Sequence, residues 1–521
     1  MNNTEKFIPI IGKNVIENLT VGMYDDARFV YREYVQNAAD QINIAKKEGL
    51  YQSDSEPSIY IQIYTDKKKI VIEDNATGIK QEEVLPLLGN IAQSTKNKYE
   101  DKGFRGIGRL GGLGYCEKLT FETSFFSEDK KSIMTWDAKR LKELFNNETV
   151  KVDAAEIISI ITDYSFNNNE DTNAHYFKVT MENVTNEVLL DVQKVREYLS
   201  MVAPVPFTNT FTFRNKIYDK AKEKGVIIDE YNVYVNTDQL FKGYKNYIYS
   251  NNAISNDDTI IDLNFFEENF KNELLFWGWY GVSKVLHQIP DENKERGIRL
   301  RKSNIQIGSD IRLDEFHKQN QGNRYFIGEV YAINKELIPN GRRDFFLDSE
   351  ECSQLTRKLQ EVFSRIHTIY YDFSKKNSAI TDSQKLEKNR EIIQDTTLDN
   401  EKKEKIETEI RKLEKKVSDA QKFIPRILNK YKDKDTVIYN VLAESIKESG
   451  FDFIPKQDDS TIQETVQSKT QTTPTTVKVT TQTLSSQEEN ILQKVYSILR
   501  TNLIKSTAEE LIQKIEEEVR K

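Results

Sequence analysis

Apolar side chains recur at a helical period in residues 25–47, a segment that contains neither proline nor glycine. The pattern then changes, because residues 58–64 alternate isoleucine with tyrosine and glutamine, and residues 69–73 form a second apolar run. We therefore predict a helix followed by two strands. The apolar positions of the predicted helix are Phe29, Val30, Tyr34, Val35, Ala38, Ile42 and Ala45.

Later segments mix β-rich and helical patterns. Residues 205–350 contain β-rich runs at 207–213 and 230–235 between short helical pieces, which suits an α/β sandwich. The apolar run 274–282 is too short to cross a bilayer and predicts a buried strand. Residues 349–373 predict a helix that follows this segment.

The C-terminal third changes in composition. A short heptad seam predicts a helix that folds back on residues 386–393, with an intermolecular coiled coil as the alternative. A further helix is expected at 436–449, and residues 456–485 are rich in Thr, Gln and Ser, which predicts a flexible linker. Helical pattern returns in residues 486–521. The seam consists of Ile406, Ile410, Leu413, Val417, Ala420 and Ile424.

Composition and charge narrow the class of protein. A chain of 521 residues predicts about three domains. The net charge of −8 does not indicate nucleic-acid binding, although a local basic face would allow it. Two cysteines give no disulfide framework, and residues 1–6 lack the apolar core of a signal peptide. We expect a cytoplasmic, soluble protein that does not bind membranes.

Candidate chemistry lies on one face of the first helix. Positions three or four apart share a helix face, so Glu33 and Asn37 form a polar pair, with Asp40 one turn further on. Asn37 can offer an oxygen to Mg²⁺, which prefers oxygen ligands. Glu33 can orient or deprotonate a water molecule. Taken alone, this segment also fits an ordinary solvated helix face.

Two further segments carry polar or glycine-rich chemistry. Asp74 stands at the end of the second strand, where a carboxylate can accept a hydrogen bond from the amine of adenine, or can close an Asx turn. Glycines concentrate at positions 106–114, where they allow backbone amides to approach an anion. The dinucleotide fingerprint is a poor fit, because the residues before these glycines are polar and charged.

Together the three segments resemble the nucleotide pocket of the GHKL ATPases, which include heat-shock chaperones of ninety kilodaltons, the DNA gyrase B subunit, MutL-type proteins, MORC ATPases and sensor histidine kinases. The closest likeness is to the chaperones. Residues 32–40 are similar to their catalytic helix, and residues 88–96 are similar to the start of their ATP lid. One departure is Ala76, which stands where the family usually has a glycine.

The resemblance implies a site for ATP and Mg²⁺. Glu33 would activate water, Asn37 would be the Mg²⁺ ligand, and Asp74 would anchor adenine. The nucleotide-binding residues that the resemblance implies are Asn37, Asp40, Asp74, Gly78, Asn90, Ser94, Thr95, Lys96, Gly106, Gly108, Gly111, Gly112 and Gly114.

The likeness extends to the middle of the chain. Residues 337–344 are similar to the catalytic loop of the chaperone middle domain, which places a catalytic cation at Arg343. Arg342 and Lys302 are alternatives for this cation. Because phosphoryl transfer asks for positioning and charge stabilisation, a cation delivered by domain closure would couple hydrolysis to conformation.

We therefore predict an α+β protein with a Bergerat-type α/β sandwich, a transducer-like middle domain and a helical extension. It would be an ATP-dependent, chaperone-like ATPase with slow hydrolysis, a homodimer, and active on an unknown macromolecular client. The alternatives are an ATP-gated DNA clamp of the MORC or MutL kind and a nucleotide-sensing scaffold of a bacterial defence system. The expected domains are 1–200 (ATP-binding), 205–350 (transducer), 351–455 (helical extension), 456–485 (linker) and 486–521 (C-terminal helical module).

Overall fold

A computed structural model describes residues 11–20, 26–51, 56–93, 99, 101–103, 106–147, 153–249, 258–394 and 399–451, with 496, 511–512 and 515 in addition. The chain divides into two compact units, residues 1–454 and 455–521. Nearly all of the described residues belong to the first unit. The predicted linker lies outside the described residues, as does nearly all of the predicted C-terminal module.

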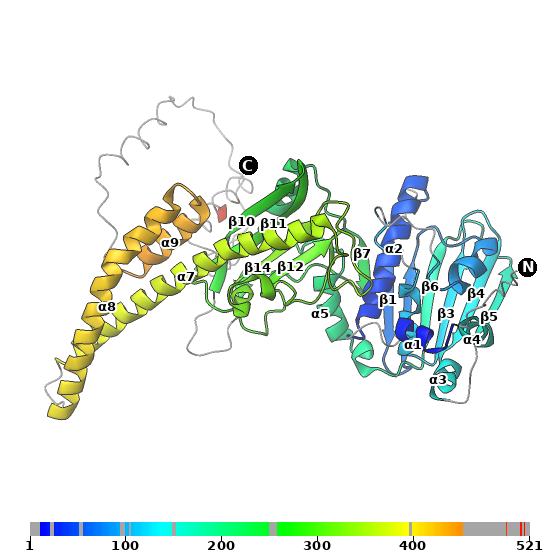
Figure 1. Cartoon of the computed structure of the whole chain (residues 1–521), viewed down its shortest axis with the longest axis horizontal. Helices are drawn as coiled ribbons and strands as arrows, with labels where there is room; N and C mark the ends of the chain where they lie inside the picture. Colours follow the sequence, from blue (N-terminus) through cyan, green and yellow to red (C-terminus); the bar gives the residue numbers. More distant parts are fainter. Residues whose placement is uncertain are drawn as a thin grey trace, which may run out of the picture. The chain divides into compact units, whose positions relative to one another are not determined.

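The first half of this unit is built on an eight-stranded sheet with strand order β5-β4-β3-β6-β2-β1-β7-β8 (Figure 1). Its described neighbouring strands pair antiparallel, except that β7 runs parallel to β1. The strands are β1 Ser58–Tyr64, β2 Lys69–Asp74, β3 Lys118–Ser124, β4 Lys130–Asp137, β5 Thr162–Asn168, β6 Tyr176–Glu182, β7 Asn232–Val235 and β8 Asp238–Gln239.

Helices cover one face of this sheet. In β1 the isoleucines are buried and Tyr60, Gln62 and Tyr64 are exposed, as expected of a sheet with one covered face. The predicted helix and both predicted strands are confirmed. The helices of this half are α1 Asn14–Thr20, α2 Phe29–Glu48, α3 Ala138–Asn146, α4 Ala154–Ile161 and α5 Val192–Val202, with the 3₁₀ segment η3 Gly108–Gly114.

The first sheet takes two strands from residues that follow α5. Asn232 of β7 pairs with Ser58, and Val235 pairs with Ile61. The sheet therefore continues past the expected boundary at residues 200–205, and the domain division stays a prediction.

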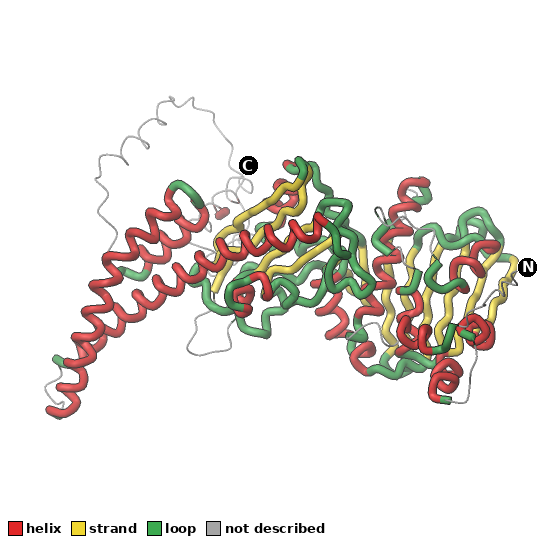
Figure 2. Tube along the Cα trace, in the orientation of Figure 1, coloured by secondary structure: helices red, strands yellow, loops and turns green. Residues whose placement is uncertain are grey.

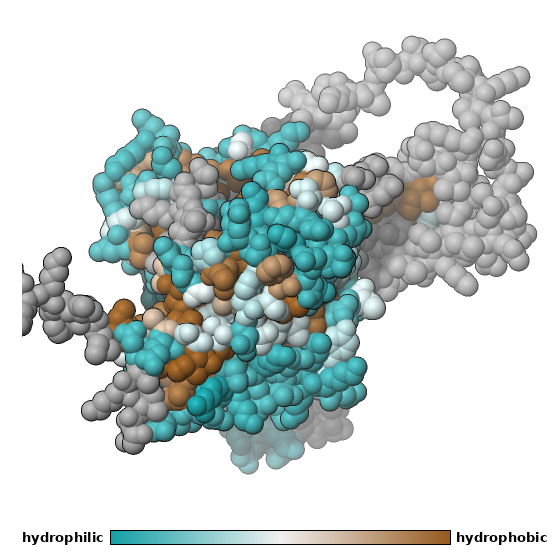
Figure 3. All heavy atoms as spheres, turned by 90° about the vertical axis from the view of Figure 1, so that its right-hand side faces the viewer, coloured by the Kyte–Doolittle hydropathy of each residue, from teal (hydrophilic) through white to brown (hydrophobic). Residues whose placement is uncertain are grey.

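Figure 3 views the end of this half near β4 and β5, where hydrophobic side chains lie between hydrophilic ones; Ile160 and Phe166 are exposed on α4 and β5.

The second half is built on a six-stranded sheet with order β13-β12-β14-β11-β10-β9. The predicted buried strand is confirmed as β11, since Leu275, Phe276, Trp277 and Trp279 are all buried. The strands are β9 Tyr247–Ile248, β10 Asp258–Phe270, β11 Glu273–Ser283, β12 Gly297–Lys302, β13 Ile305–Gln306 and β14 Ile327–Ala332.

Residues 207–213 do not form the predicted β-rich run. Phe207 makes only an isolated bridge to Lys242, and the chain then turns into helix α6, Arg214–Glu223. The reason is packing: Phe207 and Phe211 join an aromatic cluster with Tyr244 and Trp279. Both side chains therefore pack into one hydrophobic core, instead of alternating between the two faces of a strand.

Three long helices complete the unit: α7 Glu350–Ile392, α8 Asn400–Lys432 and α9 Thr436–Glu448. Helices α7 and α8 lie side by side as a hairpin (Figure 2), and Arg390 pairs with Glu414 at 2.7 Å. Leu386 of α7 is buried, as are Leu413 and Ala420 of α8. The predicted hairpin is therefore confirmed, and it explains the apolar seam without a second chain.

A buried ionic network links the two halves. Glu329 of β14 accepts hydrogen bonds from Lys242 at 2.7 Å and from Arg301. Arg301 also donates to the Met201 carbonyl at the end of α5, at 2.6 Å. Burial alone would raise the pKa of Glu329, but Arg301 and Lys242 outweigh that effect and hold the pKa below its usual value.

We expect Glu329→Gln to lower the free energy of unfolding by about 3 kcal/mol or more, because it leaves two buried cations without their counter-charge. Urea unfolding measures the loss. The control is Glu267→Gln, which removes an exposed partner of Lys224 and should cost about 1 kcal/mol or less. Equal losses in the two variants would contradict the role assigned to the network.

Candidate functional site

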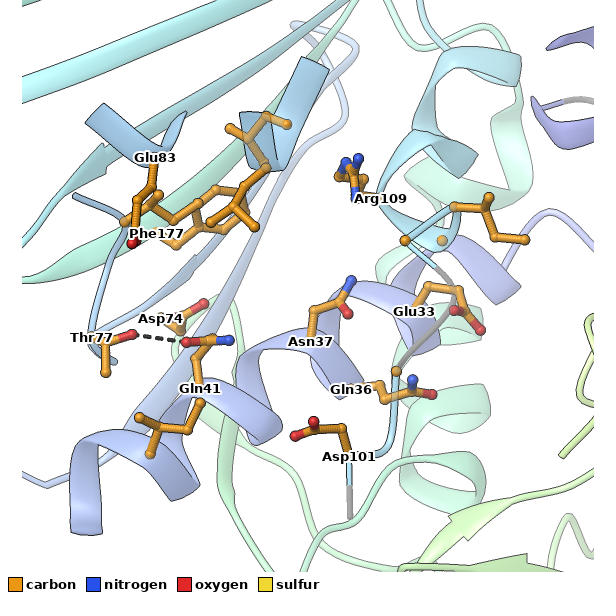
Figure 4. Close-up of a pocket in the computed structure, with 18 of the residues that line it drawn as sticks. Glu33, Gln36, Asn37, Gln41, Asp74, Thr77, Glu83, Asp101, Arg109 and Phe177 are labelled. Carbon is orange, nitrogen blue, oxygen red and sulfur yellow. Dashed lines mark hydrogen bonds between the residues drawn. The ribbon is translucent and has the colours of Figure 1, made fainter. Parts of the chain in front are cut away.

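A cavity of about 530 Å³ opens beside α2, between the end of β2, the start of η3 and the loop around residue 341. Figure 4 shows Glu33, Asn37 and Asp74 among the side chains that line it. The structure thus brings together residues from four segments that lie far apart in the sequence. The predicted site residues that line the cavity are Glu33, Asn37, Asp74, Gly78, Gly106, Gly108 and Arg343.

Glycines allow the loop before η3 to lie directly on α2. A Cβ atom added to Gly108 would stand 2.4 Å from Oε2 of Glu33, and one added to Gly103 would stand 2.5 Å from Nε2 of Gln36. The backbone at these positions therefore covers the polar face of the helix. A side chain at either position would push the loop off that face.

Asp40 fixes this loop from behind. Its carboxylate accepts hydrogen bonds from the backbone amides of Lys102 and Gly103, each at 2.9 Å. Lys102 also forms an ion pair with Asp229 at 3.2 Å. Asp40 does not line the cavity. Its hydrogen bonds hold the loop before η3 in position, and its expected role in nucleotide binding stays a prediction.

The turn after β2 forms the opposite wall. Asp74 accepts a hydrogen bond from the Ala76 amide at 3.1 Å, which is the Asx turn that the sequence also allowed. Ala76 does not adopt a positive φ; the left-handed residue is Gly78, at φ +67°. A Cβ atom on Gly78 would stand 1.8 Å from the Ser124 carbonyl oxygen. The substitution at position 76 therefore leaves the turn unstrained.

The structure adds site residues that the sequence patterns missed. The Thr77 hydroxyl donates to the Gln41 side chain at 2.8 Å, across the cavity wall (Figure 4). Arg109 also lines the cavity, and burial lowers its pKa to about 10. The signal for Gln41 was present, since it lies one helical turn beyond Asn37 on the same face.

The remaining predicted contacts lie elsewhere. Gly111, Gly112 and Gly114 belong to η3 and do not line the cavity; Gly112 packs against Tyr34 and Leu119 instead. Asn90 is exposed, and its carbonyl accepts a hydrogen bond from Arg109 at 2.5 Å. The prediction for these residues therefore finds no support in the cavity lining. Ser94, Thr95 and Lys96 lie outside the described residues.

Arg343 is the one of the three candidate cations that lines this cavity. It is buried, and its φ is +55°. Arg342 is exposed. The Lys302 ammonium donates to the carbonyls of Ile333 and Asn334, at 3.1 and 2.7 Å. The geometry thus separates the alternatives that the sequence left open.

Arg32 connects the helix to the Arg343 loop. Its guanidinium stands 3.4 Å from the Glu33 carboxylate and donates to the Arg342 carbonyl at 3.5 Å. It also lies over the Phe29 ring, 4.3 Å from the centroid. Arg32 is fully buried. A charge of the first half therefore holds the backbone of a loop from the second half.

The donor set suits a hard cation bound together with phosphates. Asn37 and Asp101 present oxygen atoms to the cavity, and Mg²⁺ prefers such ligands and keeps several waters. Within the described ranges, no cluster of three His, Cys, Asp or Glu side chains could hold a metal ion. The oxygen-bearing side chains of Asn37 and Asp101, which line the cavity, would fit a hard cation such as Mg²⁺.

Residues 29–170 match a family model described as histidine kinase-, DNA gyrase B-, and HSP90-like ATPase. The chain is 32% identical over 163 residues to the chaperone protein HtpG of Buchnera aphidicola subsp. Cinara cedri, covering 28% of this chain and 25% of the relative. It is 28% identical over 131 residues to HtpG of Francisella tularensis subsp. novicida, covering 22% and 21%.

The matched segment thus spans about a quarter of these relatives. Residues 29–170 are therefore similar to the ATPase domain of the GHKL superfamily, and the chain has distant similarity to HtpG chaperones. The predicted family resemblance and the α+β fold class are confirmed. The family implies ATP binding. Among the described helices, none is long and apolar enough to span a membrane.

The position of Lys302 gives a prediction about pH. Burial lowers its pKa to about 8, whereas an unfolded lysine titrates near about 10.4. Between these values the unfolded chain binds more protons, so this group makes the free energy of unfolding rise with pH, by about 2 kcal/mol. We expect Lys302→Met to remove that rise. The readout is urea unfolding at pH 7.5 and 10.

The matched control is Lys318→Met, because Lys318 is an exposed lysine of the same half. That variant should keep the pH dependence of the parent chain. Identical pH profiles for Lys302→Met and the parent chain would contradict the prediction.

Proposed function

We propose that this chain is an ATP-dependent conformational switch that binds ATP with Mg²⁺ and hydrolyses it slowly. The observation that carries the proposal is that Glu33, Asn37, Asp74 and Arg343, from segments far apart in the sequence, line one cavity. Its volume of about 530 Å³ lies within the usual range for small-molecule sites. The family match over residues 29–170 supports the same reading.

Each residue of the cavity has a task in this proposal. The Asp74 carboxylate, at the end of β2, would accept a hydrogen bond from the exocyclic amine of adenine. The backbone at Gly106 and Gly108 would approach the phosphates, because these positions carry no Cβ atom. Asn37 would hold Mg²⁺ through its side-chain oxygen. The ion would neutralise charge that develops on the phosphates.

Glu33 is the proposed general base. It is buried on α2 and lines the cavity, so it can orient a water molecule and accept its proton. Its partner Arg32 lies beside it at 3.4 Å. A carboxylate held by a cation has fewer lone pairs directed at water, which supports the proposal that turnover is slow.

Arg343 is the proposed cation of the second half. Its loop follows β14, whereas the rest of the cavity comes from the first half. A guanidinium can stabilise the charge of the transferring phosphoryl group. Because this group depends on the docking of the second half, hydrolysis would report the relative position of the two halves. Such coupling is what makes an ATPase a switch.

The wider role is a further part of the proposal. The relatives are named as chaperones, and we propose a chaperone-like activity, in a cytoplasmic homodimer, on a macromolecular client. The proposed division is an ATP-binding domain at 1–200, a transducer at 205–350 and a helical extension at 351–455. Strand β7 would then be a part of the transducer segment that completes the first sheet.

The first test separates nucleotide binding from chemistry. Asp74→Asn should abolish ATP binding, because an amide would face the adenine amine; a buried mismatch of this kind costs about 1–3 kcal/mol or more. Glu33→Ala should retain ATP and lose about 10²-fold or more in turnover. Calorimetry gives the affinities, and phosphate release gives the rates. Normal affinity in Asp74→Asn would disprove the pocket assignment.

The second test concerns the cation. Arg343→Ala should leave ATP affinity close to that of the parent chain and lower kcat by up to about 10³-fold. Arg342→Ala is the matched control. Arg342 is the exposed neighbour of Arg343, so removing its side chain should lower kcat much less. If both variants turn over ATP at the parent rate, the second half supplies no catalytic group.

A further inference from the structure

A second cavity, of about 740 Å³, lies where the start of α2 and the end of α5 face the second sheet. Figure 1 shows α5 at this junction of the two sheets. The walls carry more arginine and lysine than aspartate and glutamate. Some of these charges are paired: Arg28 donates to Asp26 at 2.7 Å, and Arg296 pairs with Asp291.

Other polar groups of this cavity have unmet bonding capacity. Arg299 is 6% exposed. Its guanidinium donates to the Gln306 side chain at 2.9 Å and to a backbone carbonyl, but its Nε atom is buried without a partner among the described residues. The Tyr198 hydroxyl is likewise buried without a partner in the described part of the chain. Both residues line the cavity.

The electrostatics favour an anion here. Arg299 makes no ion pair with a carboxylate within the described residues. Burial lowers its pKa, and the more distant carboxylates of Asp310 and Glu329 offset this only in part. A buried cation without a directly paired carboxylate is unfavourable, and so is a buried hydroxyl without a hydrogen-bond partner. Lys294 and Arg342 are exposed and also line the cavity, so they can add charge at its rim. Guanidinium groups match phosphate oxygens well.

We propose that this second cavity binds a small phosphorylated anion. Its volume lies in the range of metabolite sites. Arg299 and the Tyr198 hydroxyl would contact the phosphate inside, and Lys294 would contact it at the rim. This binding is separate from the ATPase function proposed above and does not depend on it.

The two cavities are coupled because Arg343 lines both of them. Arg343 places the two cavities side by side, so an anion in the second cavity and nucleotide phosphates in the first repel each other electrostatically. Each ligand therefore weakens the binding of the other by the same factor. This coupling, unlike the anion binding itself, rests on the proposed nucleotide site.

The test titrates the full chain with pyrophosphate in the absence of Mg²⁺, by calorimetry. Tyr198 and Lys294 line the second cavity and not the first. Tyr198→Phe and Lys294→Glu should each weaken pyrophosphate binding by about tenfold. Asn37 lines the first cavity and not the second, so Asn37→Ala should leave the affinity for pyrophosphate unchanged. Lys318→Glu is the control for a charge reversal at an exposed lysine. Tyr198→Phe should keep the Tm of the parent chain, since the hydroxyl has no hydrogen-bond partner among the described residues.

The opposite pattern, in which Asn37→Ala loses pyrophosphate and Tyr198→Phe does not, would place the anion in the first cavity and overturn the proposal. Citrate is the second probe, and preferential citrate binding would overturn the phosphate assignment. For the coupling, pyrophosphate should weaken binding of a non-hydrolysable ATP analogue in the parent chain and not in Lys294→Glu. An unchanged analogue affinity in the parent would disprove the coupling.

These outcomes are distinguishable from failure of the proposed function. A chain that binds the ATP analogue but not pyrophosphate keeps its nucleotide site and loses the second one. A chain that binds pyrophosphate in a manner sensitive to Tyr198→Phe, but binds no ATP analogue, keeps only the second site.

Discussion

The buried carboxylate of Glu329 organises the junction on which the candidate site depends. It balances Lys242 and Arg301 in an interior where either cation alone would be unfavourable. Arg301 in turn binds the last turn of α5 through the Met201 carbonyl, at 2.6 Å. The backbone amide of Lys242 donates to the Pro206 carbonyl at 2.8 Å. The network therefore fixes the connection between the two sheets and, with it, the approach of the second half to α2.

Because the second half packs close to α2, the polar face of this helix is buried. A surface helix would leave Arg32, Glu33, Gln36 and Asp40 in water, but all four are buried. Glycine backbone covers Glu33, the amides before η3 satisfy Asp40, and the Arg343 loop meets Arg32. Burying these groups is unfavourable unless each is paired. In the proposed function, a ligand bound in the cavity would complete this pairing.

Local sequence patterns predicted the elements whose structure is set by neighbouring side chains. The period of α2, the alternation in β1 and the seam of the α7–α8 hairpin all follow from side chains close in sequence. The family resemblance located Glu33, Asn37, Asp74 and Arg343, which line one cavity. The features that local patterns did not predict depend on residues distant in the sequence. Aromatic packing removed the predicted strand at 207–213, and no local signal reported that β7 would pair with β1 or that Asp40 would bind the amides of residues 102 and 103.

The backbone around Arg343 determines where its guanidinium lies. Its φ of +55° is uncommon for a side-chain-bearing residue, and such a conformation costs on the order of 1–3 kcal/mol. It persists because the surroundings over-determine it. The Arg343 amide donates to the Asn340 carbonyl at 3.1 Å, its carbonyl accepts from the Gly308 amide at 2.8 Å, and Arg32 holds the neighbouring carbonyl. With the backbone fixed on three sides, the guanidinium is held at the wall that the two cavities share. Among the described residues that line the two cavities, Arg343 is the one they share, so this strained backbone fixes the residue at which we propose that the cavities are coupled.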